Sequence, residues 1–152
     1  MRVFFLFLIA IIFSVIYQSA NAQNLIDKNF TGKYVESFAN GQQKYEANYK
    51  NGKKEGLEIF WYESGSKKIQ TNYVNDLENG VWNQWYENGQ KKLEAHYKDG
   101  KEDGFFQQWH ANGLIRAEAN FKDGLKIGRE IYWENDGKVK SEAFYQNGKI
   151  SE

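Results

Sequence analysis

Few residues in this 152-residue chain are of the types that carry catalysis or bind metals. The chain has no cysteine and two histidines, His96 and His110. Without cysteine there is no disulfide framework, no thiolate nucleophile and no Cys-ligated metal. A histidine that binds a metal or acts as a general base needs converging partners, and the spacing places none beside either ring. We therefore expect no enzyme, no catalytic residue, no metal and no cofactor.

Glutamates recur at a fixed phase, which raises the question of carboxylate catalysis. Each of them follows a Lys or Arg by two residues: Glu46, Glu94, Glu118 and Glu142. Opposite charges repeated in this way are typical of cross-strand pairing on the surface of a sheet. No phosphate-cradling glycine loop and no serine nucleophile elbow accompanies them. The charges therefore predict a solvated sheet face.

The overall charge argues against a nucleic-acid partner. Lys and Arg number 20 and Asp and Glu number 20, so the formal net charge is zero, whereas nucleic-acid binding calls for a clustered basic excess. The recurrent Lys column is offset by its Glu neighbours, so attraction to anionic lipid is weak at most. The length allows one domain.

The N-terminal segment has the layout of a signal peptide. Met1 and Arg2 precede an apolar run of about 14 residues, 3–16, which is shorter than the roughly 20 residues that span a bilayer. Ala20 and Ala22 have the small-residue spacing of a cleavage site. We predict a signal peptide at 1–22, cleavage before Gln23, and an exported protein that is periplasmic, attached to the cell envelope or secreted. An uncleaved N-terminal anchor is the alternative.

A 24-residue period runs through the rest of the chain. Three in-phase columns of glycine-type residues carry it, and one of them is Gly32, Gly56, Gly80, Gly104 and Gly128. A fixed period of this length indicates a repeat array. We assign five repeats to residues 32–152, with residues 23–31 as an N-terminal lead or cap.

Each repeat contains two turn signals between short runs with β-character. Asn88-Gly89 and Asp99-Gly100 mark the clearest copy, and such dipeptides are strong hairpin signals because they tolerate positive φ. Helix is disfavoured because glycine interrupts every run. The predicted fold is all-β, an elongated antiparallel meander of hairpin repeats with about ten strands, folding as a monomer.

The register of the hairpins decides which side chains share a face. A strict two-residue loop at Asn88-Gly89 pairs Trp85 with Lys92, on the charged face. A three-residue loop with Gly89 as a bulge places Trp85 beside Leu93 and Ala95 instead. We favour the bulged register, because it gathers the Trp column with the Ala and Tyr columns.

Two aromatic residues depart from the period. Trp82 and Phe106 share a phase with Glu58 and Glu130, so the repeat itself does not require them. In the favoured register they lie on the face opposite Trp85, and an aromatic patch among charges is typical of a recognition surface. The predicted binding residues are Trp82, Tyr86, Phe106 and His110. The alternative is that cross-strand aromatics simply stabilise both faces of the sheet.

The repeat pattern resembles that of a known family. The residues that carry the resemblance are Gly80, Trp82, Trp85-Tyr86-Glu87-Asn88-Gly89, Glu94, Tyr97 and Asp99-Gly100. They are similar to the variant MORN repeat of the YwqK-type antitoxin family. The resemblance implies an elongated β-sheet used for binding, with toxin neutralisation as the role that the family name suggests. Asp76 departs from the pattern by replacing a glycine, and the signal peptide places any immunity role outside the cytoplasm.

Three classes of partner remain for such an array. A protein partner, such as a toxin, is the first. A cell-wall or glycan ligand is the second; wall-binding hairpin repeats also use Trp, Tyr and Asn-Gly, but with the aromatics after the turn, whereas here Trp precedes it. A membrane-surface scaffold is the third.

Overall fold

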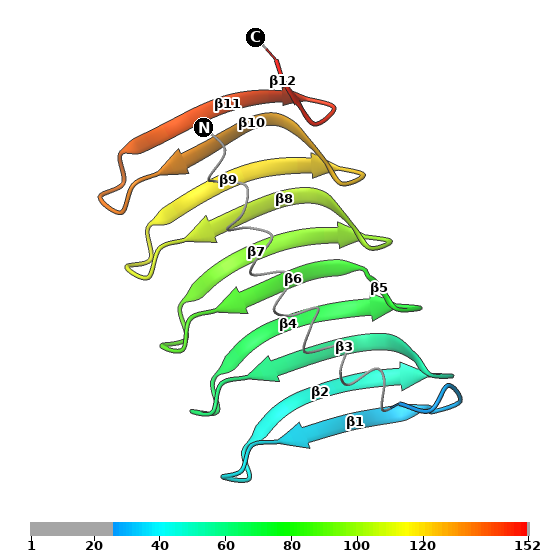
Figure 1. Cartoon of the computed structure of the whole chain (residues 1–152). Coiled ribbons are helices and arrows are strands. Elements are labelled where there is room, and N and C mark those ends of the chain that lie inside the picture. The colour runs from blue at the N-terminus through cyan, green and yellow to red at the C-terminus, as the bar shows by residue number, and fades with distance from the viewer. Residues whose placement is uncertain (1–25, 152) are drawn as a thin grey trace.

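The computed structural model describes residues 26–151. These residues form one antiparallel β-sheet. The strands follow one another in sequence order, with the short β5 pairing with β4 beside that path (Figure 1). The predicted signal peptide, 1–22, lies outside the described residues. In residues 26–151 no helix is long and apolar enough to cross a membrane. The strands are β1 (Gly32–Ser37), β2 (Gln43–Lys50), β3 (Lys53–Trp61), β4 (Lys67–Val74), β5 (Leu77–Glu78), β6 (Gly80–Trp85), β7 (Lys91–Lys98), β8 (Lys101–Trp109), β9 (Ile115–Lys122), β10 (Leu125–Trp133), β11 (Val139–Gln146) and β12 (Lys149–Ile150).

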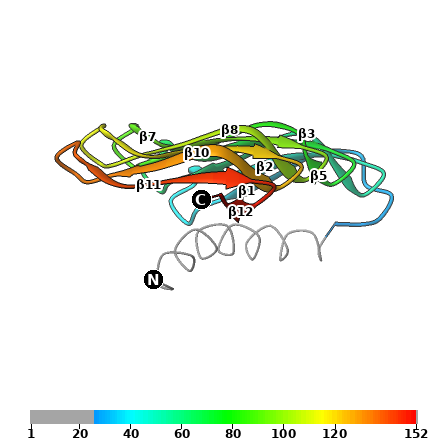
Figure 2. The same ribbon diagram turned by 90° about the horizontal axis from the view of Figure 1, so that it is seen from above.

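The predicted all-β meander of hairpin repeats is confirmed. Each 24-residue unit contributes two long strands, and the sheet has twelve strands rather than ten because β5 and β12 are additional strands of two residues each. Seen from above, the strands form a single layer (Figure 2). The array is therefore held together by contacts between neighbouring repeats, as in other repeat proteins.

The turns between repeats are two-residue turns in which both residues have positive φ, as at Asp99 (50°) and Gly100 (76°). Asp and Gly suit these conformations. Asp76 replaces glycine at φ 68°, and its carboxylate accepts a hydrogen bond from the Lys54 backbone N–H at 2.7 Å. The substitution at Asp76 therefore keeps the geometry of the turn and adds a bond to the preceding repeat.

The turns within repeats contain three residues, 87–89 in the third repeat. Tyr86 N–H donates to the Gln90 carbonyl at 2.8 Å, and Gly89 N–H donates to the Tyr86 carbonyl at 2.9 Å. Gly89 has φ 85°, a conformation that glycine adopts without a steric penalty.

The register beyond this loop differs from the favoured prediction. Trp85 pairs with Lys91, and the pairing then shifts so that Gln84 lies opposite Leu93. This second irregularity offsets the shift that the three-residue loop introduces. The prediction that Trp85 lies beside Leu93 and Ala95 is wrong because it allowed for one bulge where the hairpin has two irregularities.

The alternation of side chains gives the sheet two unlike faces. We call the side with the recurrent Tyr and Ala residues the Tyr face, and the opposite side, with the recurrent Glu residues, the charged face. The buried cluster lies on the Tyr face and comprises Tyr45, Ala47, Tyr49, Phe60, Ile69, Trp82, Leu93, Ala95, Phe106, Ala117, Ala119 and Phe121. Ile26 and Phe30 of the N-terminal lead pack against it, with the Phe30 ring edge-on to Tyr49 at 5.9 Å.

Candidate functional site

The predicted binding residues Trp82 and Phe106 lie on the Tyr face, so their predicted place on the charged face is wrong. Trp82 is opposite Ala95, Phe106 is opposite Ala119, and each side chain is 6% exposed. The Phe106 ring also meets Phe121 edge-on at 6.0 Å. Small alanines opposite large rings let neighbouring strands interdigitate, so both aromatics contribute to the packing of this face.

The other two predicted residues, Tyr86 and His110, lie at the hairpin loops and join one repeat to the next. The Tyr86 hydroxyl donates to the Trp109 carbonyl at 2.8 Å, as the Tyr62 hydroxyl does to the Trp85 carbonyl. His110 Nε2 lies 3.1 Å from the Trp133 carbonyl, to which it donates when that nitrogen carries the proton. His110 is therefore a substitute for tyrosine in a ladder of hydrogen bonds between repeats.

When each hairpin is counted as one repeat (β1–β2, β3–β4, β5–β7, β8–β9 and β10–β11), the second and fifth repeats carry a Lys–Glu pair on the Tyr face. Lys54 Nζ and Glu58 Oε1 are 2.5 Å apart, and these residues are 3% and 0% exposed. Tyr45 donates its hydroxyl to the same carboxylate oxygen at 2.8 Å, and the ammonium lies 4.7 Å from the centre of the Tyr73 ring. Ionic, hydrogen-bonding and cation–π contacts thus stabilise the ammonium and the Oε1 atom of Glu58, while the buried Oε2 atom has no hydrogen-bond partner.

The fifth repeat has a similar arrangement, in which the hydroxyl comes from the same strand as the glutamate and not from the preceding strand. Lys126 forms an ion pair with Glu130, Tyr132 donates its hydroxyl to the same glutamate at 3.0 Å, and the ammonium lies 5.1 Å from the centre of the Tyr145 ring. The lysine, the glutamate and the tyrosine ring beside the ammonium therefore recur at the same phase, whereas the hydroxyl donor does not.

The third and fourth repeats replace that unit. Glu78 and Glu102 stand at the phase of the two lysines, and Trp82 and Phe106 stand at the phase of the two glutamates. Both central carboxylates are half-buried. We call this set the acid–aromatic strip: Glu78, Glu102, Tyr73 and Tyr97 as its half-exposed groups, with Trp82 and Phe106 beneath them.

Burial sets the protonation of the strip. It raises the pKa of the Glu78 carboxyl, and the nearby charge of Glu58 raises it further, while Lys54 and a hydrogen bond from Tyr73 act in the opposite direction. Burial likewise raises the pKa of Glu102, while Lys126 acts in the opposite direction. The pKa of Tyr97 is raised by burial and by the charge of Glu102. Two desolvated carboxylates beside tyrosine rings favour a cationic group that would stabilise their charge.

The charged face of the central region carries a second feature that the sequence analysis missed. Leu57, Val81 and Phe105 are 43%, 40% and 37% exposed and share one phase of the repeat. At that phase the first and fifth repeats have Lys33, paired with Glu46 at 2.9 Å, and Arg129, paired with the Glu142 carboxylate. We call Leu57, Val81 and Phe105 the apolar row. Comparing repeats column by column would have identified it.

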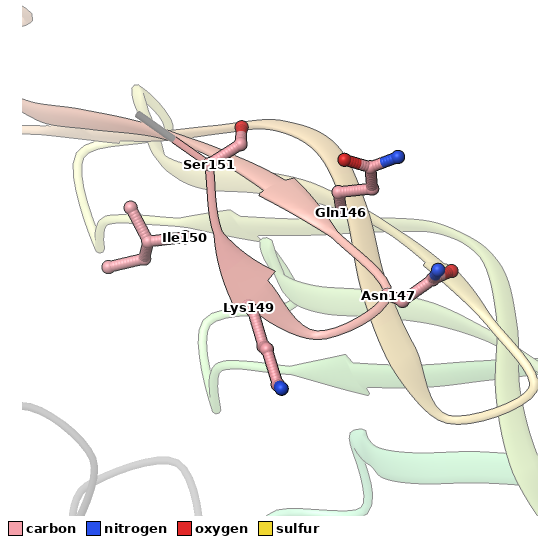
Figure 3. Close-up of a pocket in the computed structure, with 5 residues that line it drawn as sticks. All are labelled: Gln146, Asn147, Lys149, Ile150 and Ser151. Carbon is pink, nitrogen blue, oxygen red and sulfur yellow. The ribbon is translucent and has the colours of Figure 1, made fainter.

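No group of three or more His, Cys, Asp or Glu among the described residues could hold a metal ion. A shallow pocket of about 330 Å³ lies at the turn between β11 and β12 (Figure 3). Its labelled side chains splay apart, Lys149 is its charged member, and none of the four predicted binding residues lines it.

Comparison with known proteins agrees with the repeat geometry. The sequence model of the MORN repeat variant matches residues 30–51, 54–75, 78–99 and 126–151, more than half of the chain. The intervening segment forms the same hairpin, β8 and β9, with the same register as β6 and β7. No curated protein matches the chain.

Proposed function

The chain belongs to the MORN repeat variant family, and we propose that it is an exported, non-enzymatic array that binds a protein partner in an immunity-like role. MORN repeats are generally modules that bind proteins or membranes. Export is supported by the layout of residues 1–22. An antitoxin acting outside the cytoplasm would bind a toxin that reaches the same compartment.

The observation that carries this proposal is the acid–aromatic strip. In the second and fifth repeats the chain itself places a lysine ammonium between a carboxylate and a tyrosine ring. The central repeats present Glu78 and Glu102 beside Tyr97 where those lysines would be. A basic side chain of the partner would restore the same set of contacts, and charge pairs at such a site give both specificity and association rate.

The test replaces the acid–aromatic strip with the Lys–Glu pairs that the second and fifth repeats already contain. The quadruple variant Glu78→Lys/Trp82→Glu/Glu102→Lys/Phe106→Glu gives both central repeats the Lys–Glu pairs of their neighbours. We expect it to fold, by circular dichroism, and to lose the protein that the wild type captures from envelope and secreted fractions. A control of equal net charge, Glu63→Gln/Glu87→Gln, changes two exposed loop residues and should capture as the wild type does.

Two other outcomes would contradict binding of a protein partner at the acid–aromatic strip. Retention of the partner by the folded quadruple variant would move the binding site elsewhere. If the wild type captures no protein but sediments with purified peptidoglycan, the array binds glycan. Export has its own test, because the intact mass of protein recovered from the envelope should correspond to a chain that begins at Gln23, and a species retaining Met1 would indicate an anchor.

A further inference from the structure

We infer that the apolar row of the charged face is a contact between two copies of this chain, related by a two-fold axis that runs along the row. The row lies on the face opposite the acid–aromatic strip, so this inference does not depend on the proposed function. Leu57, Val81 and Phe105 come from β3, β6 and β8. They are separated by two strand spacings each, about 9.6 Å, and the strands between them carry Asn72 and His96 at this level of the sheet.

The repeat does not need these apolar residues. Lys33 and Arg129 occupy the same phase and bond to Glu46 and Glu142, so a charged residue is compatible with the fold there. Three exposed apolar side chains in line, at positions where the outer repeats are charged, favour burial against another surface.

The charges beside the row make the charged face complementary to itself, although Glu94 is already paired with Lys91 and Lys122 with Asp103 within the chain. In β7, Glu94 lies on one side of the row and the exposed Lys98 on the other, and β9 repeats this with Glu118 and Lys122. A two-fold axis along the row keeps each strand in place along the array and reverses its direction. It therefore sets Glu94 against Lys98 of the second copy, and Glu118 against Lys122 of the second copy.

The same operation sets each apolar residue against its own counterpart. Val81 faces Val81, with Leu57 and Phe105 facing their equivalents on either side. Such a contact is isologous and closes as a dimer. An axis parallel to the strands would instead oppose glutamates to glutamates, so the charges select the axis along the row.

The size of the contact sets its strength. Three apolar side chains and two flanking bands of charge correspond to a small interface, under about 1,200 Å² in total, which is the range of weak and transient association. We therefore expect a reversible dimer that forms at high micromolar concentrations and weakens as salt screens the flanking charges.

The experiment measures association of the chain expressed from its full sequence. Sedimentation equilibrium across a concentration series should show a monomer–dimer equilibrium for the wild type. Val81→Lys/Phe105→Arg, which gives the central repeats the residues of the outer ones, should weaken dimerisation at least tenfold while keeping the circular dichroism of the wild type. A wild type that stays monomeric to millimolar concentration, or a dimer unaffected by these changes, would overturn the inference.

Cross-linking locates the axis independently. The chain has no cysteine, so Val81→Cys introduces a single thiol. Packed sheets lie about 10 Å apart, too far for a disulfide, so a short bismaleimide is the appropriate reagent. It should link two copies through Val81→Cys and not through Val139→Cys, although Val139 is the more exposed, at 58% against 40%. Equal yields from both variants would contradict the proposed axis.

Discussion

The second and fifth repeats differ from the third and fourth at two positions that are four residues apart, and the difference is coordinated. Lysine accompanies glutamate in Lys54–Glu58 and Lys126–Glu130, whereas glutamate accompanies an aromatic residue in Glu78–Trp82 and Glu102–Phe106. Because the two positions change together, they act as one structural unit. The same type of hairpin repeat therefore presents either an internally neutralised surface or an acidic one on the same face.

This comparison separates what the fold requires from what it tolerates. The repeat keeps its glycine-type turns in every copy, whereas Thr71 replaces alanine once in the Ala column and Phe38 occupies the phase of Tyr62 and Tyr86 without a hydroxyl. In the second to fifth repeats the variable pair has two solutions, and the buried carboxylate of the Lys–Glu solution has a cation beside it. Binding can differ between repeats at these positions, because some repeats carry a Lys–Glu pair there and others carry a glutamate and an aromatic residue.

The largest expected effect is the loss of the cation from a flanking unit. Lys54→Ala leaves the Glu58 carboxylate, 0% exposed, without its ion pair, and should lower the free energy of unfolding by about 3–5 kcal/mol. Urea denaturation measures it. Lys122→Ala removes an ion pair whose lysine side chain is 57% exposed, and should cost under about 1 kcal/mol. Equal costs would show that the Lys54 pair is not compensating a buried charge.

Truncation of a central aromatic should be comparably severe. Trp82→Ala should cost about 3–5 kcal/mol, because the side chain is buried and the cavity cannot be refilled from a single layer. Trp85→Ala should cost clearly less, since Trp85 is half-buried at the end of its strand. Thermal unfolding of the two variants side by side checks the order, and the reverse order would contradict the register.

The ladder of hydrogen bonds between repeats should contribute modestly to the free energy of unfolding. Tyr86→Phe removes the hydroxyl that bonds the Trp109 carbonyl, and should cost about 1 kcal/mol. Phe38 occupies the same phase in the first repeat without a hydroxyl, so the ring itself is accommodated. Tyr86→His should recover part of the loss, because His110 makes the equivalent contact. If the wild type, Tyr86→Phe and Tyr86→His are equally stable, the hydrogen bonds of the ladder do not stabilise the fold.

The smallest effect is a dependence on pH that belongs to the central repeats. Burial raises the pKa of Glu78 and Glu102, so above the usual carboxyl pKa the folded state holds protons that the unfolded state releases. The free energy of unfolding therefore falls as pH rises through that window. Glu78→Gln/Glu102→Gln should be more stable than wild type at pH 7 and about equal at pH 4. A gain that is the same at both values would exclude titration as its cause.

The sequence predicted much of this fold because period, turn chemistry and alternation are local signals. Asn88-Gly89 and Asp99-Gly100 identified the turns, and the 24-residue spacing identified the repeats. The face of Trp82 was mispredicted because Lys91 and Lys92 form a second irregularity that the sequence does not mark. Tyr86 and His110 looked like recognition residues because the carbonyls they bond belong to the next repeat, 23 residues away. The paired change at positions 78 and 82 was visible in the sequence columns, but its meaning depends on the register.

The most direct test of the account is a double-mutant cycle at Glu78 and Trp82. Trp82→Glu alone places a second carboxylate beside Glu78 with no lysine and should destabilise the third repeat strongly. Glu78→Lys/Trp82→Glu recreates the unit of Lys54 and Glu58, and urea denaturation should show a favourable coupling of about 1–3 kcal/mol. If the costs of Glu78→Lys and Trp82→Glu simply add, the two positions do not form a unit, and the comparison between central and flanking repeats has no structural basis.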